Sequence, residues 1–125
     1  MQGDIIYFEL PLDLARLDDT LRFYRTLFGW SIKESFISRQ RDSIFQTPGN
    51  PISGGFDSNL KPSIDSINIY IGVDSIDKAV QSIHQEFPHT VVIKDKTFIS
   101  KQDGSYALII DPSGNKIGLN EFSKM

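Results

Sequence analysis

The sequence contains no cysteine. This excludes disulfide bonds, thiolate nucleophiles and cysteine-based zinc sites within the 125 residues. A chain of this length does not depend on such cross-links, because it buries about two-thirds of its extended surface when it folds. The absence of cysteine also fits a reducing compartment, and we therefore expect a cytoplasmic protein.

Long apolar runs and excess positive charge are also missing. No apolar run approaches the ~20 residues of a membrane span, and Met1–Asp4 lacks the basic residues that begin a signal peptide. The chain has 13 Lys and Arg against 16 Asp and Glu, a net charge of −3. Nucleic acid binding needs a basic patch. We therefore expect neither a membrane nor a nucleic acid as partner.

The chain does contain one order of predicted elements that occurs twice. Hydrophobic periodicity and β-forming residues predict a strand, a helix and three strands in the first half: residues 5–10, 14–28, 30–36, 43–46 and 52–56. The second half has the same order: residues 67–71, 76–87, 90–93, 106–110 and 116–119. A repeat of this size predicts two packed βαβββ modules and an α+β fold.

The positions of the repeated elements predict a single domain over residues 1–125. Module one covers about 4–57, a linker about 58–65 and module two about 66–123. Gly29 is expected to end the first helix, and Asp74 or Ser75 to cap the second. Residues 39–42 are interpreted as a turn. Residues 94–104 are interpreted as a polar stretch with a short apolar interruption.

The run Asp111–Leu119 predicts a closing hairpin. Pro112 fixes φ for a turn, and Gly114 with Asn115 tolerates positive φ. In the strand that follows, alternation places Lys116, Gly118 and Asn120 on one face and Ile117 and Leu119 on the other.

Four segments of the chain resemble the vicinal oxygen chelate superfamily, which includes glyoxalase I, extradiol dioxygenases, and bleomycin and fosfomycin resistance proteins. These segments are Phe8–Pro11, Leu21–Trp30, Ile71–Ala79 and Asp111–Leu119. The resemblance implies that the two modules form a curled mixed β-sheet with a concave cavity and with the helices outside. It also implies a small-molecule ligand and is compatible with a homodimer. It does not identify a function, because the fold serves many.

Strand alternation then assigns the two faces of the first strand of each module. The face expected to pack on the helices carries Ile6, Phe8, Leu10, Ile67, Ile69 and Ile71. The face expected to line the cavity carries Tyr7, Glu9, Asn68 and Tyr70.

Metal-dependent members of the superfamily place His, Gln or Glu at four cavity positions, on the first and last strands of each module. In this chain the corresponding positions are Tyr7, a residue of Gly54-Gly55-Phe56, Asn68 and Gly118. Glycine and phenylalanine have no side-chain ligand to offer. The histidines, His84 and His89, are predicted to lie outside the cavity strands. We therefore expect no metal and no other cofactor.

The remaining cavity candidates are polar or aromatic residues that could contact a ligand: Tyr7, Phe56, Asn68, Tyr70, Lys116 and Asn120. Tyr106 is ambiguous, because the pattern does not fix the phase of its strand. Glu9 is the candidate catalytic residue, since a carboxylate enclosed by aromatic rings would have a raised pKa and could act as a base. The alternative is that Glu9 and Lys116 only neutralise each other.

The leading hypothesis is a metal-free glyoxalase/bleomycin-resistance-like protein that binds a small apolar or aromatic molecule. One alternative is an enzyme of the lyase, isomerase or dioxygenase type that uses Glu9 or an atypical metal site. Another is a resistance protein that sequesters an antibiotic, although a net charge of −3 gives little support to an acidic groove for a cationic drug.

Overall fold

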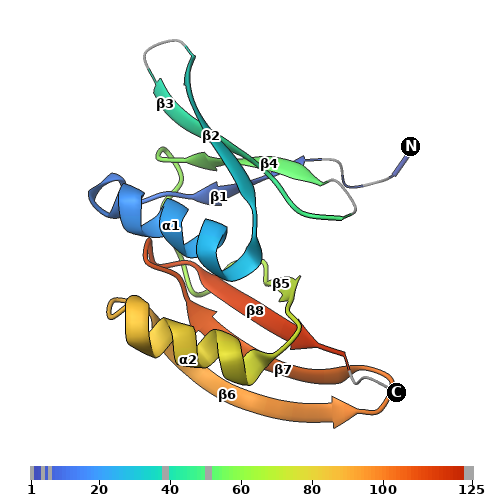
Figure 1. Cartoon of the computed structure of the whole chain (residues 1–125). Coiled ribbons are helices and arrows are strands. Elements are labelled where there is room, and N and C mark those ends of the chain that lie inside the picture. Colours follow the sequence, from blue (N-terminus) through green and yellow to red (C-terminus); the bar gives the residue numbers. More distant parts are fainter. Residues whose placement is uncertain (1, 4, 6, 38–39, 50–51, 123–125) are drawn as a thin grey trace. The chain divides into compact units, whose positions relative to one another are not determined.

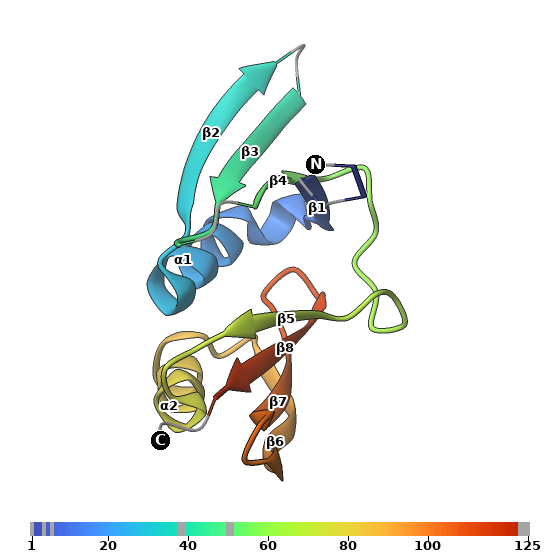
Figure 2. The ribbon, with the colours of Figure 1, turned by 90° about the vertical axis from the view of Figure 1, so that its right-hand side faces the viewer.

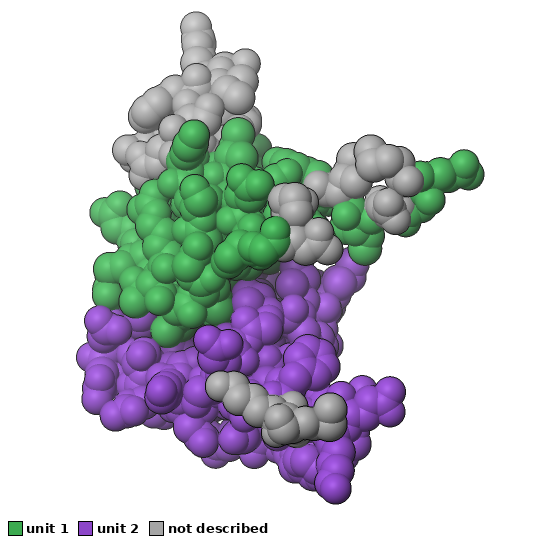
Figure 3. All heavy atoms as spheres, turned by 45° about the vertical axis from the view of Figure 1, so that its right-hand side comes forward, with its two compact units in different colours: residues 1–62 green, residues 63–125 purple. Residues whose placement is uncertain are grey.

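The computed structural model describes residues 2–3, 5, 7–37, 40–49 and 52–122. The chain divides into two compact units, Met1–Pro62 and Ser63–Met125, coloured green and purple in Figure 3.

Among its described residues, unit 1 contains one four-stranded mixed sheet and one α-helix (Figure 1). In chain order its elements are β1 (Tyr7–Pro11), the 3-10 helix η1 (Leu14–Arg16), α1 (Leu17–Phe28), β2 (Ser31–Ile37), β3 (Gln40–Gln46) and β4 (Ser53–Asp57). The strand order is β1-β4-β3-β2, with β1 parallel to β4 and the other pairs antiparallel.

Unit 2 repeats this topology (Figure 2). Its elements are β5 (Ile69–Gly72), α2 (Ile76–Glu86), β6 (Val91–Ser100), β7 (Gly104–Ile110) and β8 (Lys116–Glu121). The strand order is β5-β8-β7-β6, again with the first pair parallel and the rest antiparallel. The prediction of an α+β chain with two βαβββ modules is confirmed.

The core of unit 1 is aromatic. The ring of Trp30 stacks on Phe45 with centroids 4.5 Å apart and on Tyr24 at 4.8 Å. Phe56 packs against Tyr24 at 5.3 Å and against Phe45 at 5.1 Å. Phe23 on α1 is buried as well. Trp30 is buried and belongs to the core.

The core of unit 2 is mainly aliphatic. It joins one face of α2 to the sheet through buried side chains: Ile71, Ile76, Ala79, Ile83, Phe87, Ala107, Ile109, Ile117 and Leu119. The alternation predicted for β8 is confirmed, because Ile117 and Leu119 are almost completely buried while the flanking Lys116 and Asn120 are half-buried.

Local signals at the ends of the helices are confirmed. Gly29 ends α1 in the left-handed conformation at φ 68°, and its N–H donates to the Arg25 carbonyl. Ser75 caps α2 by accepting a hydrogen bond from the Lys78 N–H at 3.2 Å.

The 111–119 hairpin is closed by its own side chains. Asp111 is buried, and its Oδ1 accepts hydrogen bonds from the backbone N–H groups of Gly114 and Asn115, both at 2.9 Å. Its Oδ2 accepts one from the side-chain amide of Asn115 at 3.0 Å. Gly114 has φ 107°, as the turn prediction requires. Asp111 and Asn115 are therefore structural residues of the turn.

Some expectations are wrong. Arg41 and Asp42 lie in β3 rather than in a turn, while residues 38–39 fall outside the described residues. The strand predicted at residues 90–93 is longer than expected, because β6 continues to Ser100. As an edge strand, β6 has polar side chains in solvent and shifts of register, for example between Lys94 and Thr97, that hide its alternation.

The predicted helix-facing set includes two isoleucines, Ile67 and Ile6, for which burial against a helix is not observed. Ile67 is 86% exposed, because β5 begins only at Ile69. Ile6 lies outside the described residues.

Candidate functional site

The parallel strand pairs show which positions of the two units correspond. In unit 1, Glu9 pairs with Gly55 and Leu10 with Phe56. In unit 2, Tyr70 pairs with Gly118 and Ile71 with Leu119. Leu10, Phe56, Ile71 and Leu119 are all buried, so the two pairs are in the same phase. Gly55 is therefore the counterpart of Gly118, and Glu9 the counterpart of Tyr70.

Gly118 is covered by the side chain of Tyr70. A Cβ built on Gly118 would overlap the Tyr70 ring, so even alanine cannot occupy this position unless the ring moves. The glycine at this position therefore allows an aromatic ring to lie flat against the strand backbone.

The residues present do not fit the metal site that the fold family implies. Gly55 and Gly118 have no side-chain donor, and Tyr70 fills the space in which a longer side chain at 118 would lie. Asn68 is a weak neutral donor, and a tyrosine binds metal only after losing the phenolic proton, whose ordinary pKa is about 10. No three His, Cys, Asp or Glu side chains in the described part of the chain are grouped closely enough to hold a metal ion.

An open pocket of about 440 Å³ lies on unit 2, and Tyr70 is one of its walls. Its lining residues come from β5, β6, β7, β8 and the segments next to them: Tyr70, Ile99, Asp103, Tyr106, Asn120 and Phe122. The rings of Tyr70 and Tyr106 meet edge to face, with centroids 6.5 Å apart and planes at 65°. This arrangement gives an apolar aromatic corner that a flat molecule can contact.

Polar groups surround this corner. Tyr106 pairs with Asn120 across the β7–β8 ladder. The Asn120 amide nitrogen donates to the carbonyl oxygens of Asp103 at 3.2 Å and Ser105 at 3.1 Å. The Lys94 ammonium lies 5.2 Å from the centroid of the Tyr106 ring, within the range of a cation–π contact.

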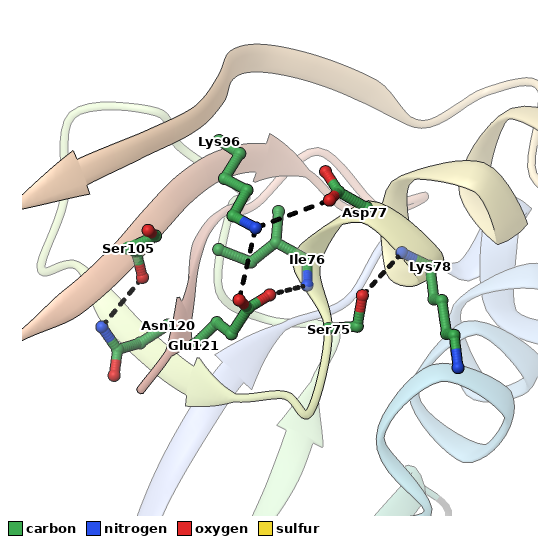
Figure 4. Close-up of polar contacts among 8 residues, drawn as sticks. All are labelled: Ser75, Ile76, Asp77, Lys78, Lys96, Ser105, Asn120 and Glu121. Carbon is green, nitrogen blue, oxygen red and sulfur yellow. Dashed lines mark hydrogen bonds and ion pairs between the residues drawn. The ribbon is translucent and has the colours of Figure 1, made fainter. Parts of the chain in front are cut away.

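A second polar cluster holds β8, β6 and the start of α2 together (Figure 4). Ile76 is the first residue of α2, and its N–H donates a hydrogen bond to Glu121 Oε1 at 2.6 Å. Glu121 Oε2 lies 3.3 Å from Lys96 Nζ, which also lies 3.5 Å from Asp77. A carboxylate at a helix N-terminus is stabilised by the helix dipole.

The charges of this cluster act on Lys96. The hydrogen bond to Glu121 raises the pKa of Lys96 above its ordinary value of 10.5; desolvation opposes this shift, and the charge of Asp77 adds to it. The cluster connects β8 to the start of α2 and to β6 on the helix side of the sheet. Asn120, the preceding residue, belongs to the pocket.

Only some of the predicted site residues lie together in the pocket of unit 2. Tyr70 and Asn120 line the pocket. Asn68 is exposed just before β5, and Lys116 is half-buried at the start of β8 opposite Ile110. Neither of these two residues lines the pocket.

The predicted residues of unit 1 lie elsewhere. Tyr7 and Glu9 are exposed on β1. Glu9 therefore lacks the burial on which the base hypothesis depended. Phe56 is only 1% exposed and belongs to the core, so its ring has almost no surface left for a ligand.

Sequence reasoning left out or missed the other pocket residues: Ile99, Asp103, Tyr106 and Phe122. For Tyr106 the sequence does not fix the phase, because residues 106–110 are all apolar or aromatic. In the structure Ala107 and Ile109 are buried, which places Tyr106 on the opposite face of β7. For Asp103, in the turn between β6 and β7, the pattern gave no signal.

Solved structures of one superfamily are similar to this chain. TnmS3, an antibiotic-binding protein from Streptomyces, is 19% identical, with 97% of each chain covered and a TM-score of 0.70. A glyoxalase/bleomycin resistance protein/dioxygenase superfamily member from Sphaerobacter thermophilus is 15% identical, over 97% of this chain and 99% of the other, with a TM-score of 0.67. The fosfomycin resistance protein FosX from Listeria monocytogenes is 16% identical, over 98% and 94%, with a TM-score of 0.68.

At these identities the likeness concerns the fold, and the chain has the vicinal oxygen chelate fold of the glyoxalase/bleomycin resistance/dioxygenase superfamily. The resemblance of the four sequence segments is confirmed at that level. No family model matches the sequence, and no curated protein matches it. Within the described ranges, no helix is both long enough and apolar enough to cross a membrane.

Proposed function

We propose that this protein binds a small apolar or aromatic molecule in the pocket of unit 2, without a metal ion. The observation that carries the proposal is the Tyr70 ring, which lies over Gly118 and forms one wall of the pocket. The position at which metal-dependent relatives carry a ligand is used here to seat an aromatic side chain.

The size and lining of the pocket support this proposal. Its volume of about 440 Å³ lies in the range of small-molecule sites, which are typically about 300–1,000 Å³. Such sites combine apolar and aromatic walls with a few polar groups. Ile99 and Phe122 supply apolar wall here, and Asp103 and Asn120 supply polar groups.

The test is a titration with indole, a small flat aromatic probe, followed by ¹⁵N-edited NMR in the presence of EDTA. We expect saturable shifts at the amides of β5, β7 and β8. Tyr70→Ala and Tyr106→Leu should each weaken binding about twofold to tenfold, because an aromatic contact is worth about 0.5–1.5 kcal/mol beyond its buried area. Phe98→Ala is the matched control, since this ring is 66% exposed and lies outside the pocket lining.

Two results would overturn the proposal. One is a titration without saturable shifts at the pocket. The other is indole binding that appears only after Zn²⁺, Ni²⁺, Mn²⁺ or Fe²⁺ replaces EDTA, which would require a metal site in place of the aromatic one.

A second candidate function is antibiotic binding, and the similarity to TnmS3 supports it. An antibiotic would be the natural ligand of the same pocket. Expression of the chain in a sensitive host should then raise the inhibitory concentration of at least one planar aromatic antibiotic, and Tyr70→Ala should abolish the protection. Equal protection by the wild type and Tyr70→Ala would contradict this candidate.

A further inference from the structure

We infer that Asn120 acts as a hydrogen-bond acceptor in the unit 2 pocket, so that the pocket selects flat ligands that carry an N–H or O–H donor. This inference rests on the proposed function and adds a class of ligand to it. It follows from the partners of the Asn120 amide, not from its residue type alone.

The orientation of the amide is fixed by its neighbours. Asn120 Nδ2 lies 3.2 Å from the Asp103 carbonyl oxygen and 3.1 Å from the Ser105 carbonyl oxygen. Carbonyl oxygens only accept, so the nitrogen must face both of them. A flipped amide would place Oδ1 against two acceptors and lose two hydrogen bonds.

The nitrogen has two N–H groups, and these two carbonyls account for both. The group left to interact with a ligand is therefore Oδ1, which only accepts. Figure 4 shows the nitrogen directed at Ser105 and the oxygen directed away from it. In the described part of the chain no donor is bonded to this oxygen, whereas the Asn120 residue itself lines the pocket.

The turn that supplies one of the two carbonyls is itself held in place. The Asp103 N–H donates to Ser100 Oγ at 2.9 Å, and the Ser100 hydroxyl lies 3.4 Å from Asp103 Oδ2. Gly104 has φ +73°, and a Cβ on it would overlap the Glu121 carbonyl oxygen. The turn therefore packs closely on β8 and keeps the Asp103 carbonyl on the Asn120 amide.

The other polar groups that line the pocket can also accept a hydrogen bond from a ligand. The Asp103 carboxylate, when ionised, only accepts hydrogen bonds, and a tyrosine hydroxyl both donates and accepts. A flat ligand with a donor can therefore bond Asn120 Oδ1 while its ring contacts Tyr70 and Tyr106. A ligand that can only accept would cover Oδ1 and leave it without a hydrogen-bond donor.

Indole and benzofuran form the matched probe pair, because they share size and shape and differ in an N–H donor against an oxygen acceptor. Both are titrated by ¹⁵N-edited NMR into the full chain. We expect indole to bind about threefold to tenfold more tightly than benzofuran, the fold-change that one net hydrogen bond gives. Asn120→Leu should remove the difference between the two probes. Gln85→Leu, an amide-to-leucine change at an exposed position of α2, should preserve it.

The outcomes separate the two claims. If both probes bind at the pocket with equal affinity, the aromatic site stands and the acceptor role of Asn120 is wrong. If benzofuran binds more tightly, the amide is oriented the other way and the inference is also wrong. If neither probe binds, the proposed function fails together with the inference. The comparison in the wild type decides these cases even if Asn120→Leu does not fold.

Discussion

The two units have the same strand order and the same parallel pair, yet unit 1 packs a cluster of aromatic rings in its core, whereas Tyr70 and Tyr106 of unit 2 lie on the opposite face of their sheet. In unit 1 the rings are packed inside, with Tyr24, Trp30, Phe45 and Phe56 in mutual contact. In unit 2 the core is mainly aliphatic, and Tyr70 lies on the other face of the sheet.

Corresponding positions make the contrast specific. Phe56 and Leu119 fill equivalent core positions, while Glu9 and Tyr70 occupy equivalent positions on the sheet face away from the core. The repeated backbone therefore fixes register and burial but not the chemistry of each face. An aliphatic core in unit 2 leaves its tyrosines available for a ligand.

The largest effect expected is the loss of a core ring in unit 1. Phe56→Ala should lower the free energy of unfolding by about 3–5 kcal/mol, because it removes apolar contacts and leaves a cavity. Phe122→Ala in unit 2 should change it by no more than about 0.5 kcal/mol, since this ring is 65% exposed. Urea unfolding measures both, and similar losses for the two variants would refute the contrast between the units.

The next effect concerns the closing hairpin of unit 2. Asp111→Ala should lower the free energy of unfolding by about 2–4 kcal/mol, because the backbone N–H and the side-chain amide of Asn115 lose their buried acceptor. The Gly114 N–H keeps the backbone carbonyl of residue 111 as acceptor. Asp95→Ala, an exposed carboxylate on β6, serves as the control. A loss no greater than that of the control would mean that the turn is held by its backbone alone.

A smaller effect is expected at the start of α2. Here a strand residue, Glu121, accepts from the first N–H of the helix, whereas Arg16 at the start of α1 makes no side-chain capping bond. Glu121→Ala should cost about 1–2 kcal/mol and Ser75→Ala about 1 kcal/mol in thermal or urea unfolding. If neither change alters stability, the cap has no energetic role.

The smallest effect is the exposed ion pair of Lys96. The raised pKa means that its stabilisation is fully present below 10.5 and is lost as the pH rises through the higher folded-state value. The stability difference between wild type and Lys96→Met should therefore be small and constant near neutrality, and should shrink above pH 10.5. If the stability difference between wild type and Lys96→Met grew with pH, it would contradict the raised pKa of Lys96.

The fold could be predicted because its signals are local and occur twice. Alternation in Ile69-Tyr70-Ile71 and in Lys116–Asn120 gave the correct phase for Tyr70 and Asn120. Phe56 was misplaced because Gly54 and Gly55 before it have no side chains to reveal the phase of β4.

The rest of the site depends on features that a single sequence does not reveal. Ile99 lies on an edge strand with register shifts, and Asp103 lies in a turn that packs on β8. In the sequence Gly118 indicates only a missing ligand, whereas its contact with the ring of Tyr70, its partner on β5, shows that the glycine makes room for a ring.

The most direct test is a double-mutant cycle between Gly118 and Tyr70, with indole affinity measured by NMR titration. If the ring is seated on the glycine, Gly118→Ala should weaken indole binding about tenfold in the wild type, because the new Cβ displaces the Tyr70 ring. In a Tyr70→Ala background the same change should have no effect on affinity. An unchanged affinity in the wild type, or an equal loss in both backgrounds, would contradict the account.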